Sequence, residues 1–440
     1  MTTQETTSGN GKGGRRAVVV GGMRTPFVRA FGELIEMDAI ALGCAAVSGL
    51  LKKLDLPIRE VESIVWGGVI LPGMAPNVGR EIAIDLGLPP TVEAMTVTRA
   101  CASGLQAITL GAAAIERGEV DVVVAGGADS TSNAELKFPQ RLIHVMAPVA
   151  LSRKSTPADY LGALMQLSPT RDILPSRPEI AERSTGQVMG EAAEEMAQRN
   201  GITRVAQDEL AVRSHHRAAA AVASKRFQNE VVAVDTPKGE RVYNDTIIRA
   251  NTSLAQMAKL RPVFSRNGTV TAGNSSALTD GAAAVVLMSE EKARALGYKP
   301  QAAFKSWAYV AIDPRDQLLL APAFAMPKAL KLAGTSLRDI DVIDMHEAFA
   351  AQVLSVVKML GSDAFAKQRL DRRKAVGDVD PERLNIHGGS IALGHPFGAT
   401  GARMVTTVAN ELALGDKSLA LLGICAAGAQ GAAAVMERVS

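Results

Sequence analysis

The feature that most constrains the fold is an order of strand-like and helix-like segments that occurs twice. In residues 16–125, short runs rich in Val and Ile alternate with runs rich in Ala and Leu, and the alternation returns after Pro300. Short continuous apolar runs are typical of strands buried on both faces, as in sheets that helices cover. Each part also ends in the same pentapeptide, Gly-Ala-Ala-Ala-Val, at 281–285 and 431–435. The repetition predicts a duplicated α/β unit.

The expected elements follow these runs along the chain. In the first part we expect strands at 16–21, 62–70, 92–97 and 120–125, and helices at 38–54, 79–86 and 105–115. In the second part we expect strands at 302–310, 340–345, 384–387 and 418–425, and helices at 323–332, 348–360 and 400–414. Between the two parts, residues 133–178 mix prolines, basic residues and short apolar clusters, and residues 184–226 are strongly helical. Such an excursion is typical of a functional loop outside the sheet.

Composition narrows the class of protein. The chain has 440 residues, of which 47% are hydrophobic, enough for a large core. A formal net charge of +3, from 48 basic and 45 acidic residues, and an aromatic content of 4% argue against a nucleic-acid partner. Three cysteines in this length indicate a reducing compartment without a disulfide framework, and no long uncharged apolar run predicts a transmembrane helix. Residues 1–15 lack an apolar signal-peptide core, so we expect a disordered tail.

Two segments far apart in the sequence carry side chains suited to nucleophilic catalysis. Cys101 stands where the apolar run 92–97 gives way to a helix-like run, and a helix N-terminus favours the thiolate. His395 lies on a glycine-rich turn, which we expect to leave its imidazole exposed. Together with Cys425, they suggest a cysteine nucleophile, a base and a second thiol. Cys44 lies in an apolar helix and is expected to be a small buried hydrophobe.

These segments belong to a longer series of motifs that resembles the thiolase superfamily. Within it, the chain is most similar to the thiolase (β) subunit of the multienzyme fatty-acid β-oxidation complex, the trifunctional-enzyme type. The resemblance covers nearly everything after the tail, with the motifs in the expected order. The matching residues are Arg24-Thr25-Pro26-Phe27, Thr98-Arg99-Ala100-Cys101-Ala102-Ser103-Gly104, Thr271-Ala272-Gly273-Asn274-Ser275-Ser276, His346-Glu347-Ala348-Phe349, Gly394-His395-Pro396 and Cys425-Ala426-Ala427-Gly428.

The resemblance implies the α/β thiolase fold. This fold has two duplicated halves, each with a five-stranded mixed sheet and helices in αβαβα layers, plus an inserted loop domain over the substrate. On that basis we expect the N-terminal half at 16–132 and 263–298, the inserted loop domain at 133–262 and the C-terminal half at 299–440.

The resemblance also implies a role for each reactive side chain. Cys101 would attack the ketone of a 3-ketoacyl-CoA, because a thiolate is a strong nucleophile and forms a thioester. His395 would take the proton of Cys101, and Cys425 would donate a proton to the enolate that leaves. His395 and His346 would stabilise one oxyanion, and backbone N–H groups of Cys101 and Ala427 a second one. Two of these residues have a plainer alternative. Cys425 lies in an Ala- and Gly-rich segment that suits a packed core, and His346 could be a hydrogen-bonded core histidine.

The substrate contacts are expected at smaller residues. Ser276 would lie against the pantetheine of CoA, although its segment could also be a simple turn before a strand. Met189 would line the acyl pocket, where ordinary core packing is the alternative. Gly428 would leave room beside Ala427, and here the sequence departs from many thiolases, which carry three successive glycines where this chain has Ala427-Gly428-Ala429.

The resemblance therefore implies an acyltransferase of fatty-acid degradation. Its expected ligands are acyl-CoA substrates and coenzyme A as co-substrate, with no permanently bound cofactor and no metal site. The expected assembly is a homodimer in complex with a hydratase/3-hydroxyacyl-CoA dehydrogenase α subunit, in a bacterial cytoplasm and with possible peripheral membrane contact. Two alternatives remain: a biosynthetic acetoacetyl-CoA thiolase, which needs the same residues, and a mainly structural subunit that docks the partner. The intact set of Cys101, His395 and Cys425 argues against the structural role.

Overall fold

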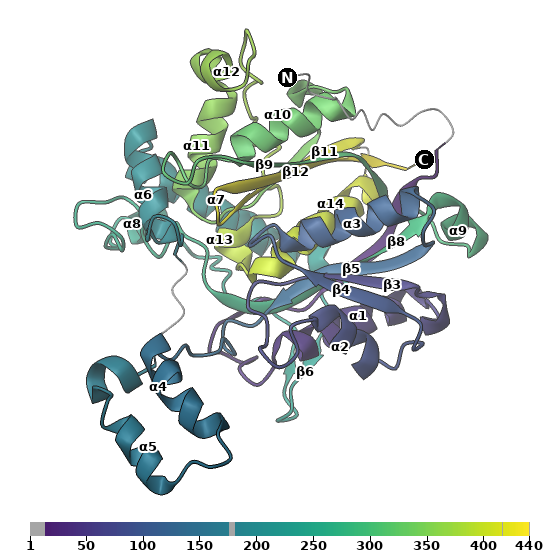
Figure 1. Cartoon of the computed structure of the whole chain (residues 1–440). Helices are drawn as coiled ribbons and strands as arrows, with labels where there is room; N and C mark the ends of the chain where they lie inside the picture. Colours follow the sequence, from purple (N-terminus) through teal and green to yellow (C-terminus); the bar gives the residue numbers. More distant parts are fainter. Residues whose placement is uncertain (1–13, 176–180, 416, 440) are drawn as a thin grey trace, which may run out of the picture. The chain divides into compact units, whose positions relative to one another are not determined.

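A computed structural model describes residues 14–175, 181–415 and 417–439 of the chain (Figure 1). The chain divides into two compact units, one formed by residues 1–133 and 181–440 and the other by residues 134–180. Residues 1–13 of the expected disordered tail, and residues 176–178 at the end of the excursion, lie outside the described residues.

The first half of the large unit is built on a five-stranded mixed sheet. Its strands are β1 (Ala17–Arg24), β3 (Ser63–Gly67), β4 (Glu93–Val97), β5 (Val122–Asp129) and β8 (Thr279–Ser289), in the order β4-β3-β5-β8-β1. Strand β3 runs parallel to β4 and β5, whereas β8 runs antiparallel to β5 and β1. The short β2 (Val28–Arg29) pairs with β8. The strands expected from the apolar runs are present here.

The second half repeats this plan with one strand fewer than expected. Its strands are β9 (Ala302–Ala311), β10 (Val342–Met345), β11 (Leu419–Ala426) and β12 (Gln430–Arg438), in the order β10-β11-β12-β9. The expected strand at 384–387 is wrong: the described residues there form a single bridge between Leu384 and Ile343. Asn385 ends the pairing, because its φ of 49° is left-handed and its side chain bonds both backbone groups of Met345.

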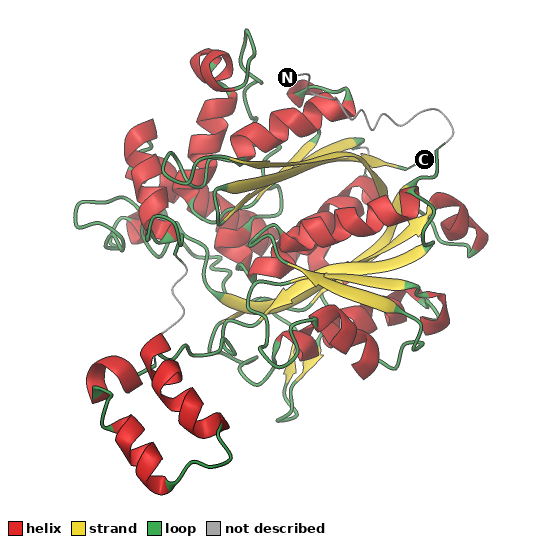
Figure 2. Ribbon diagram, viewed as in Figure 1, coloured by secondary structure: helices red, strands yellow, loops and turns green. Residues whose placement is uncertain are grey.

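Helices and sheets of the large unit alternate in five layers (Figure 2). Helices α1 (Ala39–Leu54) and α2 (Val78–Asp85) pack on the outer face of the first sheet, and α10 (Pro322–Ala333) and α11 (Ala350–Leu360) on that of the second. Helices α3 (Ser103–Glu116) and α14 (Phe397–Leu414) lie between the sheets, in a hydrophobic cluster that takes residues from both. Edge strands β1 and β9 also pair, at Val18 with Ala303, so the two sheets are continuous.

Small residues allow the two central helices to meet closely at their N-terminal ends. A Cβ atom added to Gly104 of α3 would lie 2.3 Å from the carbonyl oxygen of Gly398, and one added to Gly401 of α14 would lie 2.4 Å from the nitrogen of Leu105. The carboxylate of Asp129, at the end of β5, accepts a hydrogen bond of 2.6 Å from the Gly398 N–H. The helix starts are therefore held together by backbone approach rather than by large side chains.

The helical region expected at 184–226 forms two helices, α6 (Met189–Asn200) and α7 (Arg204–Ala223). Gly201 separates them, because its φ of 60° ends α6 in the left-handed conformation that favours glycine. His215 on α7 is buried, and this burial, followed by the nearby charges of Arg249 and His216, lowers its pKa to about 4. The remaining elements of this unit are β6 (Val234–Asp235), β7 (Arg241–Val242), α8 (Leu254–Met257), α9 (Glu290–Ala295), α12 (Asp363–Arg369), α13 (Ser390–Leu393) and 3₁₀ turns at Ile58–Glu60, Arg226–Asn229 and Leu337–Asp339.

The small unit consists of helices α4 (Gln140–Leu151) and α5 (Pro157–Leu164) and a π-helical turn at Pro169–Ile173. A capping box at Thr156 and Asp159 starts α5. Many of its large apolar side chains are exposed, with Leu151 at 84% and Met165 at 80%. An exposed apolar set of this size is typical of a surface that contacts another molecule.

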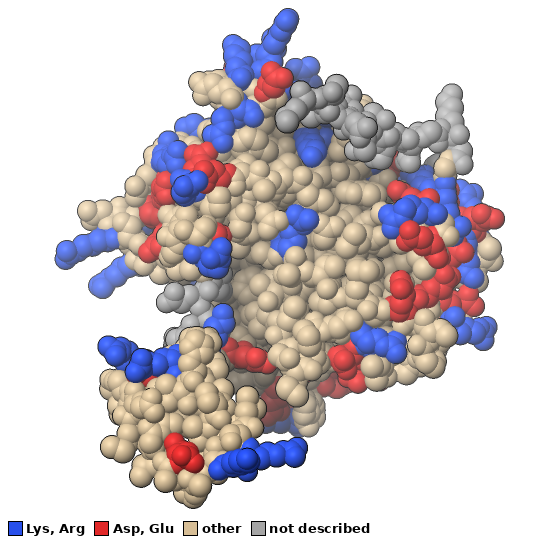
Figure 3. Space-filling model, in the orientation of Figure 1, with Lys and Arg blue, Asp and Glu red and all other residues tan. Residues whose placement is uncertain are grey.

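Two surface properties bear on the class of protein. Basic and acidic side chains are interspersed around a large uncharged area on the face drawn in Figure 3, so neither sign dominates that face. Within the described ranges, no helix has both the length and the apolar character needed to cross a membrane.

Candidate active site

Cys101 lies on a tight bend between β4 and α3. Ala100, immediately before it, has a φ of 46°, a left-handed value that is unusual for a residue with a side chain. Ser103 stabilises the bend, because its hydroxyl donates to the Ala100 carbonyl (2.6 Å) and accepts from the Arg99 N–H (2.8 Å). The bend places Cys101, a half-buried residue, two residues before the start of α3. Its backbone N–H and that of Ala427 both donate toward the sulfur.

His395 lies on the segment that joins α13 to α14. Gly394, with a φ of 101°, allows the chain to turn there, and a Cβ added to it would clash with Thr279 at 2.6 Å. The imidazole Nδ1 is hydrogen-bonded to the Thr400 hydroxyl at 2.6 Å. The expected exposed histidine is wrong: His395 is only 5% exposed, because α14 and the segment at Leu278 enclose the glycine-rich turn. Burial lowers the pKa of His395 to about 3, so its imidazole is neutral at pH 7.

His346 follows the last residue of β10 and is fully buried. Its Nδ1 is hydrogen-bonded to the Ser390 hydroxyl at 2.8 Å, and its ring centroid lies 4.0 Å from that of His395. Burial, followed by the neighbouring His395 and Arg403, lowers its pKa well below the usual value. The next residue, Glu347, fixes this segment by accepting hydrogen bonds from Ser214, Asn385 and the Ile391 N–H.

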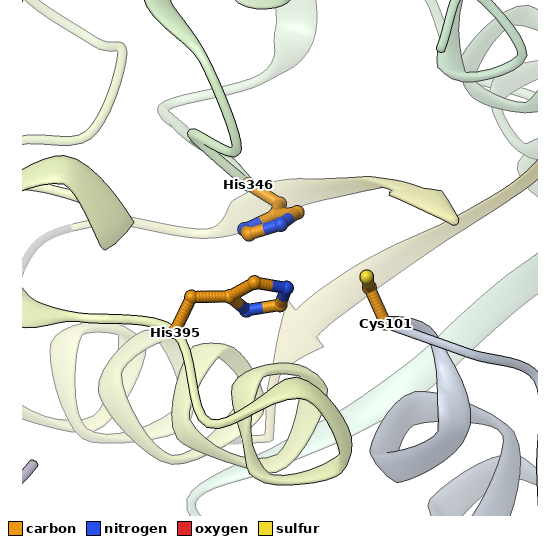
Figure 4. A group of neighbouring side chains, drawn as sticks. All are labelled: Cys101, His346 and His395. Carbon is orange, nitrogen blue, oxygen red and sulfur yellow. The ribbon is translucent and has the colours of Figure 1, made fainter. Parts of the chain in front are cut away.

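The three side chains converge on one point (Figure 4). The Cys101 sulfur and one nitrogen from each of His346 and His395 lie within 4.8 Å of one another. In both histidines Nδ1 is hydrogen-bonded to a hydroxyl. The other ring nitrogen, Nε2, is buried and has no hydrogen-bond partner among the described residues. The arrangement can therefore supply a nucleophile, a base and an oxyanion donor within reach of one substrate atom.

Cys425 lies in β11, beside the same point, and is buried. Burial raises its pKa well above the usual value, and the nearby Cys101 raises it further. Burial also raises the pKa of Cys101, to about 12, and outweighs the Ala427 N–H, which lowers it. The expectation that the helix start favours the thiolate is wrong in this resting state, because desolvation of the thiolate costs more than the backbone donors recover.

Comparisons with known proteins agree with this geometry. Residues 17–291 match the family Thiolase, N-terminal domain, and residues 298–438 match Thiolase, C-terminal domain. The chain is 44% identical over 426 residues to proteins named 3-ketoacyl-CoA thiolase from Yersinia pestis (strain Pestoides F) and Yersinia pseudotuberculosis serotype O:3 (strain YPIII), covering 96% of this chain and 97% of each relative.

The chain belongs to the thiolase family. Two solved structures share its fold with a TM-score of 0.83 each. The Bacillus anthracis acetyl-CoA acetyltransferase is 30% identical, covering 97% of this chain and 99% of that one, and human mitochondrial 3-ketoacyl-CoA thiolase is 29% identical with the same coverage.

The remaining predicted residues of this thiolase lie at different places around the site. The N–H of Ser276 donates to the Ala348 carbonyl at 2.9 Å, so Ser276 stands beside the chain segment that carries His346. Met189 begins α6 and packs against the hydrophobic cluster that contains Cys425. Ala427 and Gly428 form the turn between β11 and β12, where Gly428 has a φ of 78°. Cys44 packs against the hydrophobic cluster beside α1, as expected, but it is half-buried and not fully buried.

One residue of this thiolase that sequence reasoning missed is Glu182. Its carboxylate accepts hydrogen bonds from the Gly428 N–H at 2.9 Å and from the Ser184 hydroxyl at 2.7 Å. On the other side of the same turn, the Gln430 side chain donates to the Ala427 carbonyl at 3.3 Å and accepts from Arg99 at 2.7 Å. Nothing in the local sequence around Glu182 signals this contact, which joins residues 246 positions apart.

Proposed function

We propose that this chain is a 3-ketoacyl-CoA thiolase. It would use coenzyme A to cleave a 3-ketoacyl-CoA into acetyl-CoA and an acyl-CoA two carbons shorter. The observation that carries the proposal is the convergence of Cys101, His346 and His395 within 4.8 Å, with Cys425 beside them. The names of the Yersinia relatives and of the human structure support the same activity.

In the first step, Cys101 attacks the ketone carbon C3. The neutral His395 takes the thiol proton as attack proceeds, because both groups are neutral in the resting site and the proton leaves sulfur only as the new carbon–sulfur bond forms. The negative charge develops on the ketone oxygen, and the imidazolium Nε2–H of His395 and Nε2 of His346 are the groups available to stabilise it. The electron pair never has to reside on an isolated thiolate.

In the second step, the C2–C3 bond breaks and the enolate of acetyl-CoA leaves. The acyl group stays on Cys101 as a thioester, and Cys425 gives its proton to C2 of the enolate. His395 then holds one extra proton and Cys425 lacks one. Passage of that proton from His395 to Cys425 returns both groups to their starting state.

In the last step, the thiol of coenzyme A attacks the acyl-Cys101 thioester. His395 removes the proton of the incoming thiol and returns it to the Cys101 sulfur when that sulfur leaves. The tetrahedral oxyanion would lie between the N–H groups of Cys101 and Ala427, which already donate toward the Cys101 sulfur in the resting site. No permanently bound cofactor is needed, and coenzyme A acts as co-substrate.

Substrate binding is assigned to residues beside this centre. We propose that Ser276 contacts the pantetheine arm, that Met189 lines the acyl pocket and that Gly428 leaves room at the thioester. We propose three parts of the chain. The N-terminal half comprises residues 16–132 and 263–298, and the C-terminal half comprises residues 299–440. Residues 133–262 form an inserted loop domain that would cover the substrate. The position of Ser276 beside the His346 segment supports the first of these assignments.

A thiolysis assay with a chain-length series of 3-ketoacyl-CoA substrates tests the function. We expect cleavage that depends on coenzyme A and extends beyond the four-carbon substrate. A second candidate is a biosynthetic acetoacetyl-CoA thiolase, which the structural similarity to an acetyl-CoA acetyltransferase favours. Activity confined to acetoacetyl-CoA would select that candidate, and no thiolysis of any member would contradict both.

We also propose a homodimer, and a complex with a hydratase/3-hydroxyacyl-CoA dehydrogenase subunit, in the bacterial cytoplasm. Strand β4 at the sheet edge pairs with β3 on one side, and Met95 there is 48% exposed, which suits contact with a second copy. The exposed Leu151 and Met165 of residues 134–180 suit a partner subunit.

Light scattering of the chain, alone and with that subunit, tests the assembly. Leu151→Asp with Met165→Asp should abolish the complex and leave thiolysis intact, whereas Val205→Asp, which changes a residue of the large unit that is 60% exposed, should leave both intact. If the double variant still binds the subunit but no longer binds anionic vesicles, residues 134–180 contact a lipid surface instead.

A further inference from the structure

The site at Cys101 has a property that thiolysis does not require. Three different side chains direct an electron-pair donor at one point, and these donors lie within 4.8 Å of one another. Nε2 of His346 and Nε2 of His395 are both buried and lack a hydrogen-bond partner among the described residues. The third donor is the sulfur of Cys101, a residue that is half-buried.

The surroundings of the two imidazoles resemble those of metal-binding histidines. Each Nδ1 is hydrogen-bonded to a hydroxyl, of Ser390 for His346 and of Thr400 for His395, which fixes each ring with Nε2 toward the thiol. When Nδ1 of each ring carries the proton and donates it to the hydroxyl, Nε2 presents its lone pair, whereas His346 carries the proton on Nε2 when it donates to an oxyanion. One thiolate and two imidazoles with a fourth position open is a donor set that Zn²⁺ accepts in proteins.

We propose that Cys101, His346 and His395 form an inhibitory binding site for Zn²⁺. Binding forms a bond from zinc to the Cys101 sulfur and one to Nε2 of each histidine, and releases the thiol proton to solvent. Zinc–sulfur and zinc–nitrogen bonds of about 2.3 and 2.0–2.1 Å require the three donors to move together by roughly 1 Å. The bound ion occupies the lone pairs of both the nucleophile and the base, so the enzyme with zinc cannot be acylated.

The inference goes beyond the proposed function, because thiolysis needs no metal ion. It is also tested separately, since metal binding is measured on the resting protein without substrate. The probe is Co²⁺, whose bond to a thiolate gives a charge-transfer absorption band in the near ultraviolet. The titration is made without coenzyme A, since its thiol also binds these ions. We expect one Co²⁺ per chain with this band, displaced by Zn²⁺. Zn²⁺ should also slow alkylation of Cys101 by iodoacetamide, and EDTA should restore the rate.

Variants distinguish this site from adventitious surface binding. Cys101→Ser should remove the charge-transfer band, and His346→Asn should weaken Co²⁺ binding at least about 10-fold, because an amide lacks the imidazole lone pair. Cys44→Ser is the matched control and should bind as the unaltered chain does. Thermal melts identify any variant that has not folded. Absence of the band in the unaltered chain, or an unchanged affinity in His346→Asn, would overturn the proposal.

A second, independent observation concerns Glu182. The residue is 9% exposed, and its carboxylate accepts a hydrogen bond from the N–H of Gly428, one residue after the Ala427 N–H that faces the Cys101 sulfur. Within its own loop, Glu182 is fixed by Ser184 and by backbone hydrogen bonds to Gln187 and Gly186. We infer that Glu182 is a positioning residue that aims the Ala427 N–H at the oxyanion of the acyl-Cys101 thioester.

This second inference rests on the proposed function, and its test separates the two. Glu182→Ala should lower kcat for acyl transfer from an acyl-CoA about 10- to 100-fold, with KM changed less than about twofold. Glu182→Gln, which keeps one acceptor oxygen, should lie between. Alkylation of Cys101 by iodoacetamide needs no oxyanion donor and should stay unchanged.

The control for Glu182 is Glu209→Ala, which removes an exposed carboxylate of α7 and should keep kcat within about twofold. An equal fall in kcat and in alkylation rate would mean that Glu182 only maintains local structure, and an unchanged kcat in Glu182→Ala would overturn the role. If the unaltered chain transfers no acyl group at all, the proposed function fails instead.

Discussion

Helices α3 and α14 both begin two residues after a reactive side chain, Cys101 in the first half and His395 in the second. The two helix starts nevertheless present these side chains differently. Cys101 stands on a strained bend at Ala100 and is half-buried, whereas His395 stands after a glycine and is buried and bonded to Thr400.

The difference suits two different tasks. A nucleophile has to be reached by substrates, so exposure matters more than a single fixed orientation. A base has to keep its tautomer and direction, so a buried hydrogen bond to Nδ1 matters more. The duplicated fold thus provides two equivalent positions at helix starts. The residues around each position decide whether its side chain is accessible to substrate or held in one orientation.

The largest test of the comparison removes the base. His395→Ala should lower kcat/KM for thiolysis about 10²- to 10⁴-fold, because a general base and an oxyanion donor disappear together. His387→Ala is the control: that histidine bonds Glu411 at 2.8 Å, and its loss should change the rate only a few-fold. Steady-state kinetics with a 3-ketoacyl-CoA decides, and a fall of less than tenfold in His395→Ala would show that the second helix start is not needed.

The next test separates the two helix starts. Gly104→Ala places a Cβ 2.3 Å from the Gly398 carbonyl oxygen, so the helices must move apart. We expect a loss of about 1–3 kcal/mol in the free energy of unfolding, measured with urea, together with a lower kcat. Gly162→Ala, where nothing lies within 4 Å of the added atom, should be neutral or slightly stabilising. Equal stability of both variants would mean that the close approach is not essential.

A smaller effect should follow from loosening the imidazole alone. Thr400→Val keeps the shape of the side chain but removes the hydroxyl at 2.6 Å from Nδ1 of His395, which leaves a buried nitrogen unpaired. This should cost about 1–3 kcal/mol of transition-state stabilisation, or roughly 10- to 100-fold in kcat. Thr400→Ser retains the hydroxyl and should recover most of the rate. If the Thr400→Val and Thr400→Ser variants have the same kcat, the hydrogen bond to Nδ1 does not orient the base.

The last test concerns the dependence of stability on pH. The pKa of His395 is lowered to about 3 in the fold and is about 6.5 when unfolded, so the unfolded chain binds more protons between these values. Stability from this group is therefore complete above about pH 6.5 and is lost as pH falls toward 3. His395→Asn should reduce the dependence of unfolding free energy on pH by at most about 1.4 kcal/mol per unit between pH 6 and 4.

Cys101→Ser provides the contrast at the other helix start. The folded pKa of Cys101 is raised to about 12, so the thiol is protonated in both states across this range. Urea denaturation at several pH values should give the same slope as in the unaltered chain. A changed slope in Cys101→Ser, or an unchanged one in His395→Asn, would contradict the directions in which the fold shifts these two pKa values.

Most of the fold follows from local sequence patterns. The Val- and Ile-rich runs predicted β1, β3, β5, β10 and β11 because such runs are stable only when both faces are covered. The strand at 384–387 failed because the left-handed backbone of Asn385 and its bonds to Met345 are tertiary features, absent from any short pattern. The break at Gly201 within the helical region expected at 184–226 carries a signal in the sequence, since glycine favours helix ends.

The site was predicted less completely than the fold. The motifs named Cys101, His346, His395 and Cys425, and the structure brings the first three within 4.8 Å. The burial of His395 and the raised pKa of Cys101 were not foreseen, because both depend on how two distant segments enclose one point. Glu182 was missed for the same reason, since its partner Gly428 is distant in sequence.

The most direct measurement of the central claim is the mass of the acyl-enzyme. The unaltered chain is mixed with an acyl-CoA without free coenzyme A, quenched in acid, digested and examined by mass spectrometry. We expect one acyl group per chain on the peptide that contains Cys101, and its loss when coenzyme A is added before the quench. An acyl group on the Cys425 peptide instead, or a Cys101→Ala variant that retains thiolysis, would contradict the account.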